Sequence, residues 1–251
     1  FLNNFLDDAK KLNLSKSVHI QAEIIDQNKI FETEWLQKIS NNHNANFPNA
    51  IVGFVDLSSK NFISDIEKHC QYKNFRGIRQ ILKSTKDDES FLKNDIWINN
   101  LKYLEKYNLS FDLLIFFHQY KSAINVIKKY PNILFIINHC FWPQNSENDF
   151  NNWTKALKSI SSFDNVVIKI SGFGEWLKNC SLSNIKPYIL ETIDCFGLDR
   201  CMFGSNFPVD KQISNKTYEF FWNIYFETTK NFSDDEKNKM FFYNAEKYYR
   251  I

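Results

Sequence analysis

Residues 133–172 decide the fold, and they read ILFIINHCFWPQNSENDFNNWTKALKSISSFDNVVIKISG. Ile133–His139 and Val166–Gly172 are short runs rich in β-branched and aromatic residues, a composition that is typical of strands. Between them, Asn152–Ser162 has apolar residues at helical spacing. A strand, a helix and a second strand within so short a stretch predict a βα unit, in which the two strands run parallel.

The same pattern repeats along the chain, with strand starts separated by roughly 30 residues. Further strands are predicted at Ser17–Ala22, Ala50–Asp56, Phe75–Ile81, Leu109–Phe117 and Cys201–Phe207. Helices are predicted at Phe1–Leu12, Thr33–Ser40, Phe62–Tyr72, Asp95–Tyr107, Ser122–Tyr130, Asn184–Phe196, Tyr218–Thr229 and Ser233–Tyr249. The last helix opens with the capping-box pair Ser233 and Glu236. Alternation of this kind predicts an α/β fold with a parallel sheet.

Two α/β architectures fit this alternation, an open doubly wound sheet and a closed barrel. The chain has six glycines and no phosphate-binding glycine loop after any strand, so a nucleotide-binding doubly wound sheet loses its main support. A (β/α)8 TIM barrel needs eight strands in about 250 residues. The chain opens on the helix Phe1–Leu12, and a helix in this place corresponds to the one that follows strand one of a barrel. We therefore predict a barrel with strands 2 to 8 present and strand 1 missing. Residues 1–251 are expected to form a single domain.

Composition excludes several classes of function. The chain has 31 basic and 29 acidic residues without a long run of like charge, which argues against a nucleic-acid partner. Its five cysteines are scattered and lack a C-x-x-C pair, a pattern that favours a reducing, cytoplasmic location over a disulfide framework. No apolar run reaches the ~18 residues of a membrane span. A small-molecule partner is therefore expected, and a homo-oligomer is compatible with the sequence.

The active site of such a barrel lies at the carboxyl ends of its strands, so the last inward-pointing residues are the candidates. Alternation along one strand places His139 at the rim, on the face of Phe135 and Ile137. The same count places Ser171 and Asn206 at the ends of two later strands. We expect these polar side chains to meet at one mouth of the barrel.

Each candidate also has a structural alternative. His139 can be a hydrogen-bonded structural residue, and Ser171 can belong to a plain strand-to-loop turn. His118, which follows another strand, can line the site, cap the next helix or lie in solvent. His43 and His69 stand away from the strand ends and are expected at the surface.

Two arginines stand on one predicted strand, where a buried cation requires an anion. Arg79 lies closer to the rim than Arg76 and can bind a substrate carboxylate through a bidentate clamp. The alternative is an internal salt bridge from Arg79 to Asp112 or to Asp56. On the first predicted strand, Gln21 is a candidate for a neutral contact to the substrate, and it shares a face with His19.

Seven segments, in order, resemble one known family. They are residues 18–23 (VHIQAE), 75–80 (FRGIRQ), 109–113 (LSFDL), 138–143 (NHCFWP), 167–172 (VIKISG), 200–210 (RCMFGSNFPVD) and 244–251 (NAEKYYRI). Together they are similar to the amidohydrolase-related (amidohydrolase 2) family of TIM-barrel hydrolases, and within it to the fuconolactonase and pyrone-dicarboxylate lactonase group.

The resemblance implies a hydrolase that opens a sugar lactone or similar cyclic ester of a small anionic substrate by attack of an activated water. It implies that His139 polarises the carbonyl or binds a divalent metal, zinc or manganese, although members without a metal also fit. It adds Trp142 as a substrate contact. The His-x-His pair that the family carries on strand one is absent. Asn206 stands where most members have Asp, and a neutral amide cannot act as the general base.

Two other readings stay open at this point. One is a metal-dependent decarboxylase of the same superfamily, which also uses a barrel with His and Asp. The other is a catalytically inactive fragment, because an open barrel exposes the edges of its terminal strands.

Overall fold

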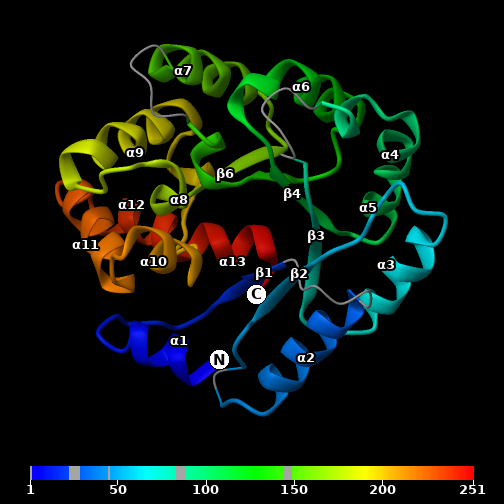
Figure 1. The fold of residues 1–251 in the computed structure, drawn as a ribbon, viewed down its shortest axis with the longest axis horizontal. Coiled ribbons are helices and arrows are strands. Elements are labelled where there is room, and N and C mark those ends of the chain that lie inside the picture. Colours follow the sequence, from blue (N-terminus) through cyan, green and yellow to red (C-terminus); the bar gives the residue numbers. More distant parts are fainter. Residues whose placement is uncertain (1, 23–28, 45, 83–88, 144–148) are drawn as a thin grey trace.

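The computed structural model describes residues 2–22, 29–44, 46–82, 89–143 and 149–251. Within these ranges, seven strands form one parallel sheet in sequential order (Figure 1). The strands are β1 (Val18–Ile20), β2 (Ala50–Gly53), β3 (Phe75–Ile81), β4 (Ser110–Leu114), β5 (Phe135–Ile137), β6 (Val166–Ile170) and β7 (Cys201–Phe203). Each lies inside a predicted strand. The parallel α/β architecture expected from the sequence is thus confirmed, as a curled, barrel-like sheet.

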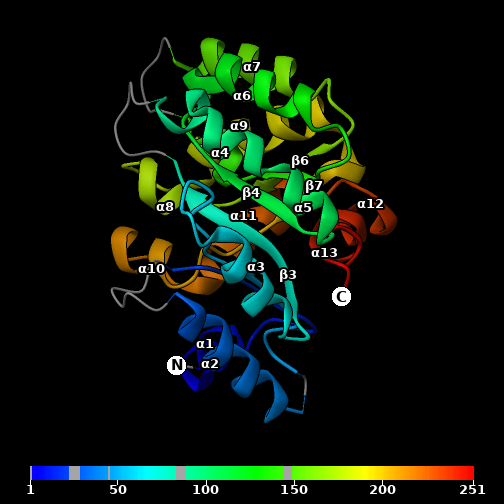
Figure 2. The same ribbon diagram turned by 90° about the vertical axis from the view of Figure 1, so that its right-hand side faces the viewer.

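Helices alternate with the strands, and Figures 1 and 2 show most of them packed around the outside of the sheet. They are α1 (Leu2–Ala9), α2 (Ile30–Asn41), α3 (Phe62–Cys70), α4 (Asp95–Asn100), α5 (Lys102–Lys106), α6 (Tyr120–Lys129), α7 (Asp149–Ile160), α8 (Phe173–Trp176), α9 (Leu182–Phe196), α10 (Val209–Ser214), α11 (Tyr218–Thr228), α12 (Asp234–Asn238) and α13 (Asn244–Tyr249). None of the helices in the described ranges has both the length and the apolar character needed to cross a bilayer.

Several predicted boundaries were wrong in detail. The helix expected over Asp95–Tyr107 is divided into α4 and α5 at Leu101. The helix expected over Ser233–Tyr249 starts with the predicted capping box, and a π-helical segment, Lys239–Tyr243, joins α12 to α13. Except for β3, the strands end two to four residues earlier than predicted.

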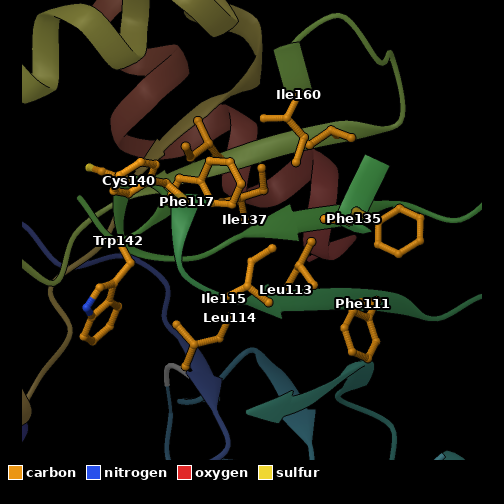
Figure 3. Close-up of a cluster of buried hydrophobic side chains, with 14 of the residues drawn as sticks. Phe111, Leu113, Leu114, Ile115, Phe117, Phe135, Ile137, Cys140, Trp142 and Ile160 are labelled. Carbon is orange, nitrogen blue, oxygen red and sulfur yellow. The ribbon is translucent and has the colours of Figure 1, made fainter. Parts of the chain in front are cut away.

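The two faces of the sheet bury different residues. Figure 3 shows Phe111, Leu113, Phe135 and Ile137 in the larger apolar cluster, which packs against the surrounding helices. The barrel interior instead takes a smaller cluster, composed of Ala50, Val52, Ile136, Val167, Met202 and Tyr249. The expected inward face of β5 was therefore wrong. Phe135 and Ile137 point outward, and Ile136 points inward.

The C-terminal helix α13 covers the amino ends of the strands. Tyr249 inserts into the interior cluster, and the Asn244 side chain donates to the carbonyl oxygens of Leu198 and Cys201, each at 2.7 Å, where β7 begins. Arg250 donates to the carbonyl oxygen of Asn108, just before β4, at 2.9 Å. These contacts close one mouth of the barrel, so the carboxyl ends of the strands form the mouth available for a site.

Among the described residues, β1 and β7 each pair with one neighbour only. The sheet is therefore open between them. That an upstream strand fills this gap stays a prediction.

Candidate functional site

The predicted site residues gather at the carboxyl ends of the strands. His118 stacks on Phe116 with ring centroids 5.5 Å apart, and Phe116 meets the Trp142 ring at 6.1 Å. Trp142 in turn meets the His139 ring at 5.4 Å. The Nδ1 atom of His139 lies 3.0 Å from Oγ of Ser171. A continuous set of contacts thus joins the ends of β4, β5 and β6.

A left-handed turn holds the centre of this cluster. His139, Cys140, Phe141 and Trp142 have φ values of 54°, 51°, 64° and 49°. Each such non-glycine residue costs about 1–2 kcal/mol of conformational energy, so surrounding contacts must hold the turn. The Trp153 indole donates to the carbonyl oxygen of Cys140 at 2.7 Å. Backbone strain of this kind is concentrated at functional sites, so the turn indicates a functional site here.

The turn separates the side chains of its residues. Cys140 and Trp142 both belong to the apolar cluster, but in Figure 3 the Trp142 side chain points away from Cys140, Phe117 and Ile137. Burial raises the pKa of the Cys140 thiol to about 12, so it stays protonated and is a poor nucleophile. His139 owes its position to the turn, and not to alternation along β5.

Gly172 and Ser171 fix the His139 ring. Gly172 has a φ of 79°, and a Cβ atom at this position would lie 2.6 Å from Cγ and Nδ1 of His139. Only glycine therefore permits the ring to rest on this turn. Ser171 is 2% exposed, and among the described residues its hydroxyl hydrogen-bonds His139 alone. Because a buried hydroxyl needs an acceptor, we infer that Ser171 donates to Nδ1 and that the His139 proton resides on Nε2.

A second buried histidine, His69, also accepts from a hydroxyl group at Nδ1 and carries its proton on Nε2. His69 was expected at the surface, but it is fully buried between α3 and α2, because Thr33 and the Phe54 carbonyl oxygen supply both of its ring partners. The carbonyl oxygen lies 3.0 Å from Nε2 and can only accept, so Nε2 carries the proton and Nδ1 accepts from Thr33. Burial lowers the pKa of His69 to about 4. His69 is thus a neutral Nε2–H histidine within the same chain.

Asn206 lies beyond β7 with a φ of 47°. Its Nδ2 atom donates to Oε1 of Glu175 and to Oδ1 of Asp210, each at 2.8 Å. Asp210 is 1% exposed, and its Oδ2 atom is buried without a hydrogen-bond partner in the described structure. Burial raises the pKa of Asp210 to about 7, although the hydrogen bond from Asn206 opposes this rise. Glu175 is half-buried.

Neither carboxyl group was singled out from the sequence. Glu175 lies on α8 and Asp210 on α10, and these two short helices pack together. The only local signal was Gly174, where an added Cβ atom would lie 2.8 Å from the Asp210 backbone. A glycine two residues after Gly172 therefore permits the close approach of the two helices.

A polar network fills the barrel just below this rim. Lys169 forms an ion pair with Asp112, which also accepts from the Asn138 amide at 3.2 Å. Asn138 accepts from Nη1 of Arg79 at 3.3 Å, and Nη2 of Arg79 donates to the carbonyl oxygen of Gln21. Burial lowers the pKa of Lys169, and the charge of Asp112 opposes this effect.

Asp112 and Asp56, the two partners considered for an internal salt bridge of Arg79, both have other partners. Asp112 is paired with Lys169, and Asp56 accepts from Ser58 and from Gln80, so the described structure shows no salt bridge from Arg79 to either aspartate. From the C-terminal helix, Tyr249 donates to Oδ1 of Asp112 at 3.0 Å. The helix that closes the far mouth therefore supports the polar layer beneath the site.

The first strand differs from expectation. Val18 and Ile20 pack in the barrel interior, so His19 faces outward, and its Nε2 atom lies 2.9 Å from Oε1 of Glu32 on α2. Burial acts to raise the pKa of Glu32, but the hydrogen bond and the charge of His19 outweigh it, and the pKa is lowered. Gln21 is fully buried.

The described residues do not fit the expected zinc or manganese ion. They gather no group of three or more His, Cys, Asp or Glu side chains that could hold a metal. His139 with its proton on Nε2 and Asn206 with a neutral amide are also weak candidates for a shared ligand set.

Comparison with known proteins identifies the family. A family model described as Amidohydrolase matches residues 33–251. The uncharacterized protein y4mH of Sinorhizobium fredii is 35% identical over 257 residues, which cover 100% of this chain and 85% of that protein. An L-fucono-1,5-lactonase of Burkholderia ambifaria is 26% identical over 210 residues, with 82% of this chain and 71% of that protein covered.

A solved structure shows the same fold. An amidohydrolase of Burkholderia multivorans, crystallised with bound zinc, superposes with a TM-score of 0.87 at 19% identity, over 99% of this chain and 88% of that chain. The family model spans most of the chain, and the similarity to y4mH covers the whole of this chain. The chain belongs to the amidohydrolase family, and by that membership it is a hydrolase.

Proposed function

We propose that the protein is a lactonase, which adds water to the carbonyl carbon of a small, anionic sugar lactone or similar cyclic ester. The proposal rests on the position of His139 at the carboxyl ends of the strands. His139 lies on a strained turn, and Ser171 and Gly172 fix its ring. The likeness to an L-fucono-1,5-lactonase supports the class of substrate.

In this proposal His139 acts as a neutral hydrogen-bond donor. Its Nε2–H group donates to the lactone carbonyl oxygen and stabilises the negative charge that develops there as water attacks. The Ser171 hydroxyl keeps the proton on Nε2, so the ring is prepared to donate before the substrate arrives. His118 and Trp142 line the site beside it.

Arg79 binds the anionic group of the substrate. Its guanidinium lies on β3 and donates to Asn138 and to the carbonyl oxygen of Gln21, beside the ion pair of Lys169 and Asp112. Charge-assisted hydrogen bonds to a carboxylate are stronger than those to a neutral group. A carboxylated lactone is therefore the preferred substrate.

The test is a panel of aldonolactones, a carboxylated lactone and an open-chain ester, assayed by proton release without metal and with added zinc or manganese. We expect turnover of at least one lactone and slower turnover of the open-chain ester. Failure to hydrolyse any lactone under these conditions would refute the proposal.

The charge preference is tested with Arg79→Gln. We expect KM for the carboxylated lactone to rise about 10- to 100-fold, the range of one hydrogen bond to a charged group, with a smaller change for a neutral lactone. Arg200→Gln is the matched control, because Arg200 donates to the carbonyl oxygens of Phe163 and Phe196 at the opposite end of the barrel. Equal changes for both substrates would remove Arg79 from substrate binding.

A further inference from the structure

Lactone hydrolysis needs a group that takes a proton from the attacking water. His139 as an Nε2–H donor cannot take that proton, and the amide of Asn206 is not basic. The position at which an acid is expected from the family resemblance is thus neutral in this chain. The base must come from another residue at the same mouth of the barrel.

Two carboxyl groups border Asn206. Its Nδ2 atom has two hydrogens, and it donates at 2.8 Å both to Glu175 and to Asp210. Both donors of the amide are therefore used to orient carboxyl groups. Position 206 itself has no negative charge, but carboxyl groups are hydrogen-bonded directly to it.

The two carboxyl groups differ in their access to water. Asp210 is 1% exposed, and burial favours its neutral form. Glu175 is half-buried and is thus the less enclosed of the two residues. A carboxylate has about four lone-pair sites, so accepting from Asn206 does not exclude accepting from a water. Glu175 is thus the better candidate for the base.

Glu175 also lies on the turn that supports His139. Its backbone amide donates to the carbonyl oxygen of Gly172 at 3.1 Å, and Gly172 is the residue on which the His139 ring rests. One turn of chain after β6 therefore links the group that polarises the carbonyl to a carboxylate.

We propose that Glu175 is the general base of this site, oriented by Asn206, a role that rests on the lactonase function proposed above. A water hydrogen transfers to the Glu175 carboxylate as the water oxygen bonds to the carbonyl carbon. The carbonyl electron pair moves to the oxygen that accepts from His139. When the carbonyl re-forms, the ring C–O bond breaks, and the leaving oxygen takes the proton from Glu175. The carboxylate is regenerated, and the hydroxy-acid product loses its own proton to solvent.

The first test is Glu175→Gln in the lactone assay. We expect kcat to fall about 100-fold or more, the lower end for the loss of a general base, with KM changed less than about threefold. Glu105→Gln is the matched control, because Glu105 accepts from the Asn132 amide at the same 2.8 Å but is exposed on α5. Wild-type turnover in Glu175→Gln would overturn the inference and leave the proposed function standing.

The second test separates a base from a structural residue. Glu175→Ala should regain turnover on addition of formate or acetate, because a small carboxylate can occupy the vacated space and accept the proton. The exchange variant Glu175→Gln with Asn206→Asp keeps the charge and the hydrogen bond, so folding should be preserved. We expect it to recover at least about 10-fold of the turnover lost in Glu175→Gln, as the carboxylate lies at the other end of the same bond. Absence of both recoveries overturns the inference, and absence of lactone turnover in the wild type overturns it together with the proposed function.

Discussion

Asp210→Asn should stabilise the protein in a manner that depends on pH. Asp210 is 1% exposed, and burial raises its pKa from 3.8 to about 7. A carboxyl group whose pKa is raised in the folded state contributes stability below its unfolded pKa, and this contribution is lost as the pH rises through the folded value. Asn is neutral at every pH and keeps the oxygen that accepts from Asn206.

The magnitude follows from the two pKa values. Each pH unit between them is worth about 1.4 kcal/mol, so the wild type loses about 2–3 kcal/mol from this residue between about pH 5 and pH 8. The variant has no such loss. In a chain of this size, the difference corresponds to roughly 5–10 °C in melting temperature.

The assay is urea unfolding of the wild type and Asp210→Asn at several pH values over that range. Other groups titrate in both proteins and cancel in the difference. Asp95→Asn is the control, because Asp95 also lies in the first turn of a short helix but is exposed, and its effect should stay within about 0.5 kcal/mol. A stability difference for Asp210→Asn that is flat or falls with rising pH would refute the buried, neutral carboxyl group.

Three further substitutions test the supports of the site. Gly172→Ala should destabilise by more than about 1 kcal/mol in thermal melts and lower turnover, because of its φ of 79° and the His139 ring 2.6 Å from the new Cβ atom; wild-type behaviour would show that the ring lies elsewhere. Ser171→Ala should lower kcat about 10-fold, the equivalent of one hydrogen bond, and ¹⁵N NMR should show the His139 proton leaving Nε2 in part, whereas an unchanged tautomer would contradict the role of Ser171. Tyr249→Phe should cost about 1.5–3 kcal/mol in urea unfolding, because Asp112 loses a hydrogen bond, and an unchanged stability would show that the carboxylate finds another partner.

The order of the elements could be predicted because its signals are local. Each βα unit has a short apolar run followed by apolar residues at helical spacing. These patterns are present in the sequence independently of the tertiary packing. Which side chains of a strand point into the barrel was harder to predict. β5 is apolar at Phe135, Ile136 and Ile137 alike, because a parallel strand is buried on both faces. Alternation then carries no information.

The site was predictable only in part, for a similar reason. His139 and Ser171 end strands, and the position of a strand end can be read from the sequence. Their mutual hydrogen bond depends on the left-handed turn after β5, for which the sequence offers no glycine. Glu175 and Asp210 meet Asn206 only because α8 and α10 pack together. Contacts between elements of this kind leave no periodic pattern in the chain.

His69 illustrates the same limit. It lies on a helix with charged neighbours, which reads as a surface position, yet Thr33 and the Phe54 carbonyl oxygen satisfy its ring in the core. A buried polar residue is compatible with folding only when such partners exist, and they come from distant parts of the chain.

The most direct test of the account is turnover of the best lactone by His139→Ala, measured together with its melting temperature. We expect kcat to fall at least ~100-fold, the scale for the loss of one stabiliser of developing charge, while the protein stays folded with a melting temperature lower by the several degrees that ~1–3 kcal/mol produces, because the buried Ser171 hydroxyl loses its partner. His43→Ala, at a half-exposed ring that stacks on Phe47, should keep wild-type turnover. If His139→Ala instead unfolds, and the fraction that stays folded turns over lactone at the wild-type rate, His139 is a structural residue and the proposed site is wrong.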